Sequence, residues 1–117
     1  MLSIDIRLAR RLALARAGLF KPALTATPQG IGTGRPARGE EALRRQAHSV
    51  IDRFGYLQLD TVSVAGARSH SIVLMSRLRR ISPALGESLL RPGEPLFEYW
   101  GHEVSWMPIS LYPVMGW

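Results

Sequence analysis

A glutamine and an aspartate stand two residues apart within the short apolar run of residues 55–61. Residues i and i+2 of a strand lie on the same face of that strand. We therefore predict a strand in which Leu57 and Leu59 point into a core. Gln58 and Asp60 would then point together from the opposite face, where an amide and a carboxylate can hold a water molecule or face bound nucleic acid. The alternative is a half-buried strand that carries two ordinary polar side chains.

The elements around this run predict an α+β fold that is mainly helical. Helices are expected over residues 40–54 and 64–78, and a short helix is expected to start at Ser82, followed by a first-turn proline. Residues 96–100 and 104–107 are expected to pair as a hairpin. The order helix, strand, helix, helix, strand, strand is typical of a winged helix, in which the helix-turn-helix enters a DNA groove and the hairpin forms the wing.

Apolar residues at helical spacing supply the predicted core. The expected core side chains are Leu43, Ala47, Val50, Ile51 and Phe54 on the first of these helices, and Ala67, Leu74, Met75 and Leu78 on the second. Glycine at position 55 is a natural C-terminal stop. Glu41 and Arg45 are expected to pair one turn apart. His48 is expected to be solvated and receives no role.

Three segments divide the chain in this interpretation. Residues 1–24 are expected to form an additional basic helix, with Ser3 as its cap, Gly18 near its end and an apolar stripe on one side. Residues 25–39 are rich in glycine, proline and threonine and predict a flexible loop. Residues 40–117 would form the winged-helix domain.

The composition favours a nucleic-acid partner. The chain has 117 residues, about one domain, and carries a formal net charge of +6 with a pI near 11.0. Every basic residue except Lys21 is arginine, whose planar fork suits phosphate. An arginine-rich solvated surface is the alternative. The absence of cysteine excludes disulfides and thiolate zinc sites and fits a reducing cytoplasm, and the sequence has no apolar run long enough to span a membrane.

Nine of the last fourteen residues, 104–117, are large and apolar, and the stretch has two prolines and no charge. A free domain rarely exposes so much apolar surface. We therefore expect a chain that is truncated at its C-terminal end, where further domains of the same protein would pack on this stretch. Without them, we expect marginal stability and self-association.

Several motifs in combination point to a known family. They are the run Gly55-Tyr-Leu-Gln-Leu-Asp-Thr-Val-Ser-Val, then Arg68-Ser-His, Leu74-Met-Ser-Arg, and Leu96-Phe-Glu-Tyr-Trp-Gly-His-Glu. Together they resemble the N-terminal part of the winged-helix DNA glycosylases of the AlkZ/YcaQ type, which unhook interstrand crosslinks and excise alkylated bases. The family motif of a glutamine, an apolar residue and a glutamine or aspartate maps onto Gln58 and Asp60. The sequence departs from the family at Gly66 and Ala67, at Ser69 and Ser71, and in length.

This resemblance implies a DNA repair glycosylase that hydrolyses the N-glycosidic bond of alkylated or crosslinked purines without a metal or other cofactor. It implies that Gln58 and Asp60 are catalytic, and the departures predict weak or no activity for this chain alone. For Asp60 the alternative is a cap of the following helix, and for Gln58 it is a surface amide. A non-catalytic winged-helix regulator is the alternative function. In either case duplex DNA is the partner, and the protein would lie in the cytoplasm with the nucleoid.

The other candidate site residues are cationic or aromatic. The predicted DNA contacts are Arg68, His70, Arg77, Arg79, Arg80, Arg7, Arg10 and Arg11, and the possible supporting residues are His102, Tyr99 and Trp100. For the arginines, a solvated face is the alternative. For His70 a packed structural role is slightly favoured, and core packing is the default for the aromatic residues.

Overall fold

The computed structural model describes residues 3–19, 39–60, 62–63 and 66–115. The chain divides into two units, residues 1–36 and 37–117. The predicted flexible loop of residues 25–39 lies outside the described residues except for Gly39.

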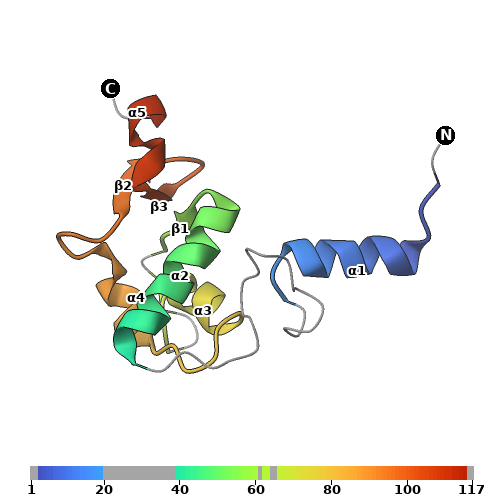
Figure 1. The fold of residues 1–117 in the computed structure, drawn as a ribbon, viewed down its shortest axis with the longest axis horizontal. Helices are drawn as coiled ribbons and strands as arrows, with labels where there is room; N and C mark the ends of the chain where they lie inside the picture. Colours follow the sequence, from blue (N-terminus) through green and yellow to red (C-terminus); the bar gives the residue numbers. More distant parts are fainter. Residues whose placement is uncertain (1–2, 20–38, 61, 64–65, 116–117) are drawn as a thin grey trace. The chain divides into compact units, whose positions relative to one another are not determined.

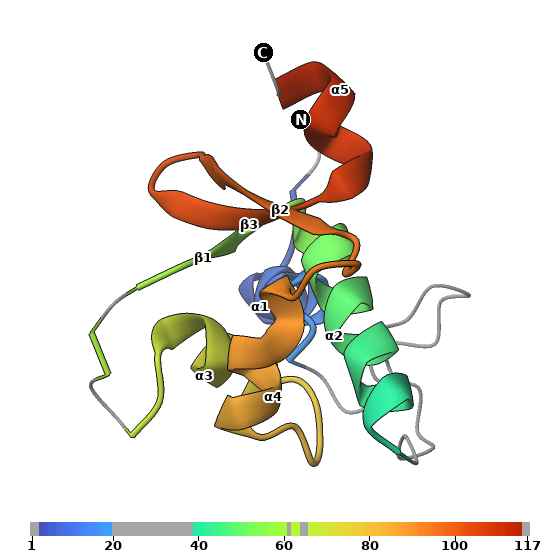
Figure 2. The ribbon, with the colours of Figure 1, turned by 90° about the vertical axis from the view of Figure 1, so that its left-hand side faces the viewer.

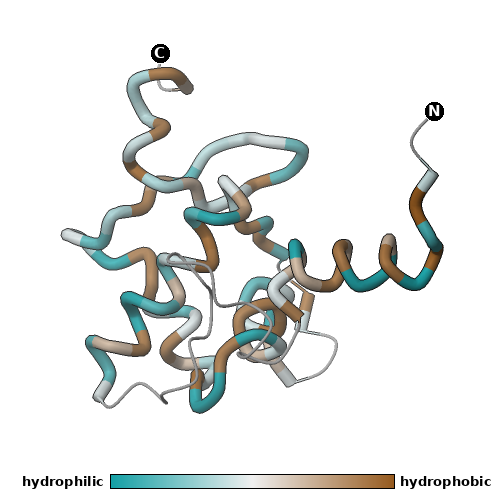
Figure 3. Tube along the Cα trace, turned by 45° about the vertical axis from the view of Figure 1, so that its right-hand side comes forward, coloured by the Kyte–Doolittle hydropathy of each residue, from teal (hydrophilic) through white to brown (hydrophobic). Residues whose placement is uncertain are grey.

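In the first unit, helix α1 spans Ile6–Arg16 (Figure 1). Its cap is Asp5, whose carboxylate accepts hydrogen bonds from the amides of Arg7 (3.1 Å) and Leu8 (3.3 Å), so the predicted capping by Ser3 is wrong. The chain leaves the helix through Gly18, which has a φ of 68°. Apolar and polar residues alternate along α1 (Figure 3), and none of the helix residues is buried.

The second unit begins with helix α2, Glu40–Phe54, at the predicted bounds. Gly55 ends it in the left-handed conformation at a φ of 80°, which a glycine adopts without strain. Of the predicted core stripe, Ala47, Val50 and Ile51 are fully buried. The periodicity of this segment therefore identified its buried face.

Three short strands form an antiparallel sheet in the order β1-β3-β2. They are β1 (Leu57–Gln58), β2 (Leu96–Trp100) and β3 (Val104–Pro108). The register pairs Leu57 with Trp106 and Trp106 with Glu98, so β3 lies in the centre. Figure 2 shows helices α2, α3 and α4 on one side of the sheet and α5 on the other.

Helix α3, Ser69–Met75, is shorter than the predicted 64–78. Gly66 has a φ of 75°, which is incompatible with a right-handed helix and delays its start. Leu74 and Leu78 are buried as predicted, but Met75 is 45% exposed. Helix α4, Pro83–Glu87, starts as predicted. Its N-cap is Ser82, whose hydroxyl accepts a hydrogen bond from the backbone amide of Leu85 (3.1 Å). A 3-10 turn, η2 (Ser88–Leu90), continues it.

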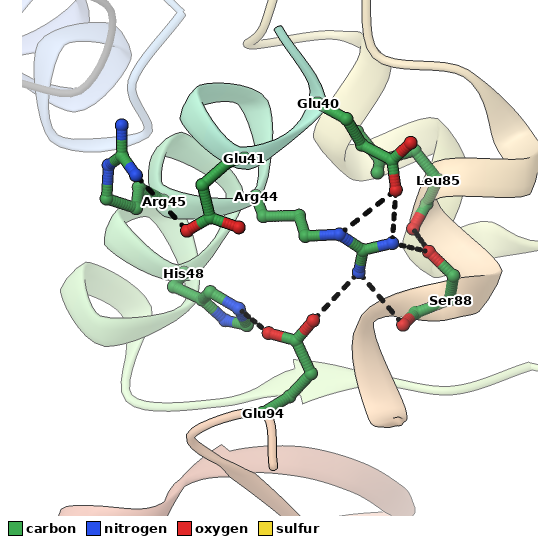
Figure 4. A network of polar contacts seen from close by, with 8 residues as sticks. All are labelled: Glu40, Glu41, Arg44, Arg45, His48, Leu85, Ser88 and Glu94. Atoms are coloured by element: carbon green, nitrogen blue, oxygen red, sulfur yellow. Dashed lines mark hydrogen bonds and ion pairs between the residues drawn. The ribbon is translucent and has the colours of Figure 1, made fainter. Parts of the chain in front are cut away.

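A buried arginine ties α2 to the segment between α4 and β2 (Figure 4). The Arg44 guanidinium donates to Glu40 (2.6 Å), to Glu94 (2.9 Å) and to both the hydroxyl (2.7 Å) and the carbonyl (3.1 Å) of Ser88. The hydrogen bond and charge of Arg44 lower the pKa of the Glu40 carboxyl. His48 lies 2.7 Å from the second Glu94 oxygen, and its side chain is only 12% exposed, so the prediction of a solvated histidine is wrong.

The apolar stretch of residues 104–117 has two parts. Its first five residues form β3, and four of them are buried in this unit, so the expectation that the whole stretch is exposed is wrong. After them come η3 (Ile109–Leu111) and α5 (Tyr112–Met115), which the sequence did not predict. Tyr112 packs edge-on against Phe97, with 5.3 Å between ring centroids, yet it remains 54% exposed.

Candidate active site

Strand β1 ends at Gln58, whose side chain is exposed. Its partner across the ladder is Ser105 of β3, and the amide of Leu59 donates to the carbonyl of Val104 (2.8 Å). Leu57 is 5% exposed, whereas Gln58 is exposed. The predicted alternation therefore holds, although the strand itself is only two residues long. Among the described residues, none forms a hydrogen bond with the side-chain amide of Gln58, so this group is available to water or a ligand.

Asp60 follows β1 and is also exposed. One of its carboxylate oxygens accepts a hydrogen bond from the amide of Val62 (2.9 Å), which is the geometry of an Asx turn. Helix α3 begins nine residues later, with Arg68 as its N-cap, so the alternative of Asp60 as the cap of that helix is wrong. Among the described residues, the second carboxylate oxygen has no hydrogen-bond donor.

Arg68 joins the Asp60 segment to helix α4. Its Nε donates to the backbone carbonyl of Asp60 (3.0 Å), and its Nη1 lies 2.9 Å from Oε2 of Glu87. The side chains of Arg68 and Glu87 are 35% and 39% exposed. Both directed contacts of Arg68 are therefore with the protein itself, which limits the direct DNA contact predicted for it.

His70 is fully buried beside Trp106, with their ring centroids 4.7 Å apart. Its Nε2 lies 3.1 Å from Oε1 of Glu87. Burial lowers the pKa of the His70 imidazole, and the Glu87 carboxylate opposes this shift only in part. A side chain with no exposed surface cannot contact DNA in this conformation, so the predicted DNA contact of His70 is wrong. The packed role is the one observed.

The remaining predicted arginines occupy different environments. Arg77 lies over the Phe54 ring at 5.0 Å and donates to the carbonyl of Val73 (3.0 Å), and burial lowers the pKa of its guanidinium. Arg79 and Arg80 are exposed in the turn between α3 and α4, with Arg80 at a φ of 71°. Arg7, Arg10 and Arg11 are exposed on α1 and belong to the other unit.

The possible supporting residues lie at the hairpin. Tyr99 is half-buried and pairs with Ser105, which also pairs with Gln58, so Tyr99 and Gln58 occupy one row of the sheet. Trp100 is 67% exposed, and His102 is exposed in the turn between β2 and β3. The default of core packing therefore does not hold for Trp100.

Sequence reasoning missed Glu87, which contacts both Arg68 and His70. It lies 19 residues beyond Arg68, and no local spacing marks it. Within the described ranges, no group of three or more acidic or histidine side chains is arranged to hold a metal ion. None of the helices described is both long and apolar enough to cross a membrane.

The fold is thus an α+β unit whose small sheet and following turn present an amide and a carboxylate beside an arginine. The family model of the AlkZ-like DNA glycosylases matches residues 51–117, more than half of the chain and every residue of this site. The chain therefore belongs to the AlkZ-like DNA glycosylase family, as the resemblance predicted. No solved structure matches the chain.

Proposed function

We propose that this chain carries the catalytic motif of a DNA repair glycosylase that releases alkylated or crosslinked purines from duplex DNA. The observation that carries this proposal is the exposure of Gln58, at the end of β1, and of Asp60, two residues later, inside the region that matches the family. The segment is held by the hydrogen bond from the Leu59 amide to Val104 of β3 and by the contact of Arg68 with the Asp60 carbonyl. A carboxylate and an amide on so fixed a segment are suited to hold one water molecule.

The chemistry needs little more than these groups. A purine alkylated at N7 is cationic, so it leaves with the electrons of the bond from the purine nitrogen to C1′ of the sugar. A water oxygen then bonds to C1′ and its proton passes to the Asp60 carboxylate, whose negative charge also stabilises the oxocarbenium-like transition state. Gln58 orients the water through hydrogen bonds. The products are the free base and an abasic site.

DNA binding is proposed for the second unit as a winged helix. The order α2-β1-α3-α4-β2-β3, with β1 at one side of β3 and β2 at the other, supports this. Arg79 and Arg80, exposed in the turn between α3 and α4, are the best placed to contact phosphate. A protein that acts on chromosomal DNA would lie in the cytoplasm with the nucleoid.

The test is base release from a duplex that contains one N7-methylguanine, with protein in excess over DNA so that slow single turnovers are detected. Removing a general base costs about a hundredfold or more in rate, and we expect this for Asp60→Asn. Gln58→Ala should cost about tenfold. Asp52→Asn is the matched control, since Asp52 is an exposed aspartate on α2 and its loss changes the net charge equally.

Equal rates for wild type and Asp60→Asn would contradict the assigned mechanism. Binding to one DNA sequence in preference to others, with no base release, would favour the non-catalytic regulator. Both functions predict an affinity that falls steeply with salt, so salt dependence tests DNA binding but does not separate them.

A further inference from the structure

We propose that Glu87 is a positioning residue, which holds Arg68 on the backbone of Asp60 and away from its carboxylate. This inference rests on the proposed role of Asp60 as the base. Residues 59–68 connect β1 to α3, and the contact from Arg68 Nε to the Asp60 carbonyl (3.0 Å) joins the two ends of this connection. Arg68 is therefore the clamp on the segment that carries Asp60.

The clamp is oriented by Glu87, which stands at the end of α4. One Glu87 oxygen lies 2.9 Å from Arg68 Nη1, and the other lies 3.1 Å from Nε2 of the buried His70. His70 is in turn packed against Trp106 of β3, the strand that pairs with β1. The carboxylate is thus placed against a rigid, fully buried side chain, and the guanidinium is placed against the carboxylate.

The choice of the Asp60 carbonyl as the acceptor has a chemical consequence. A guanidinium prefers to bind a carboxylate through two parallel hydrogen bonds. Arg68 instead forms its ion pair with Glu87 through Nη1, and only its Nε donates a hydrogen bond to the neutral Asp60 carbonyl. Without Glu87, the same guanidinium would be free to pair with the Asp60 carboxylate, which would block the water site and stabilise the ionised base. Glu87 therefore keeps the base both in place and unpaired.

The first experiment compares Glu87→Gln with Glu41→Gln in the single-turnover assay. Glu41 is a matched control because it also pairs with an arginine (Arg45, 3.1 Å) and its loss changes the net charge equally, but it lies on α2 outside this cluster. We expect Glu87→Gln to lower the rate of base release about tenfold or more, with a DNA dissociation constant equal to that of Glu41→Gln. A rate equal to that of the control would overturn the proposal.

A double-mutant cycle then separates positioning through Arg68 from a general structural role. If Glu87 acts through Arg68, Glu87→Gln should have no further effect on the rate in the Arg68→Ala background. Rate losses that multiply in the double variant would show that Glu87 acts by another route, and the proposal would fall.

The last measurement does not depend on activity. The amide of Val62 donates to the Asp60 carboxylate (2.9 Å), so its hydrogen exchange reports whether the Asp60 turn is held. We expect several-fold faster exchange of this amide in Glu87→Gln and Arg68→Ala, and no change in Glu41→Gln. If the wild type releases no base, glycosylase activity of this chain alone is excluded, and the exchange measurement still tests the positioning role. Unchanged exchange at Val62 in both cluster variants would overturn the positioning role whatever the activity.

Discussion

Arg44 and Arg68 each bind a glutamate from a distant segment, but they do so in opposite surroundings. The Arg44 side chain is 8% exposed, and its partner Glu94 is 19% exposed. The side chains of Arg68 and Glu87 are 35% and 39% exposed. The same guanidinium–carboxylate pair is therefore largely buried at Arg44 and Glu94 and partly exposed to solvent at Arg68 and Glu87.

The difference separates two uses of an ion pair. Where water is excluded, removing one partner leaves a charge that nothing else can satisfy, so the pair is required for folding. Where water reaches both groups, it replaces the lost partner at small cost, so the pair sets a position and contributes little stability. We call Arg44, Glu40, Ser88 and Glu94 the Arg44 cluster, and Arg68, His70 and Glu87 the Arg68 cluster. We expect the Arg44 cluster to maintain the fold and the Arg68 cluster to maintain the site.

The largest effect is expected for Arg44→Ala. It would remove a donor from Glu94, which keeps its His48 contact, and from the hydroxyl and carbonyl of Ser88, all in a largely buried place. We expect a loss of about 3 kcal/mol in the free energy of unfolding, measured by urea denaturation. A loss below about 1 kcal/mol would contradict a structural role for the Arg44 ion pair, because exposed ion pairs contribute that much or less.

A smaller effect, dependent on pH, is expected from His70, the buried member of the Arg68 cluster. Burial lowers the pKa of His70 in the folded state below its ordinary value of 6.5. As the pH falls through 6.5, His70 of the unfolded chain takes up a proton before His70 of the folded chain, which favours unfolding. The stability that His70 contributes is therefore complete above pH 6.5 and is lost as the pH falls toward the pKa of the folded state. The slope from one group cannot exceed about 1.4 kcal/mol per pH unit.

The measurement is urea denaturation of wild type and His70→Gln at several values between pH 7 and pH 5. The variant should lose less stability than wild type over this interval, whatever its stability at pH 7. Parallel curves for the two proteins would show that His70 does not titrate differently on folding.

The sequence predicted the elements whose signals are local. Helix α2 was predicted at its observed bounds because its apolar spacing ends at a glycine, and α4 was found from a serine followed by proline. The faces of Gln58 and Asp60 followed from the two-residue period of strands, which holds here even for a strand of two residues. Helix α3 was predicted too long at its start because apolar spacing continued through Gly66, whose positive φ does not fit a right-handed helix.

The two arginine clusters could not be predicted in the same way. Arg44 and Glu94 are 50 residues apart in sequence, and Arg68 and Glu87 are 19 apart. Such pairs meet only after the helices and the sheet have packed, so neither spacing nor composition reveals them. For the same reason, sequence reasoning considered His48 and His70 without the glutamates that lie beside them.

The smallest effect is expected for Arg68→Ala, and it completes the comparison. This substitution removes a half-exposed ion pair and one hydrogen bond to the carbonyl of the exposed Asp60, both of which water can replace. We expect a loss of less than about 1 kcal/mol in the free energy of unfolding, together with a lower rate of base release, because Asp60 loses the contact that holds its backbone. Arg45→Ala is the control. Arg45 pairs with Glu41, four residues before it on α2, just as Arg44 pairs with Glu40, but the Arg45 side chain is 66% exposed. If Arg68→Ala destabilises the protein as strongly as Arg44→Ala, then the Arg68 cluster is part of the structural core, and a fall in activity would follow from unfolding alone.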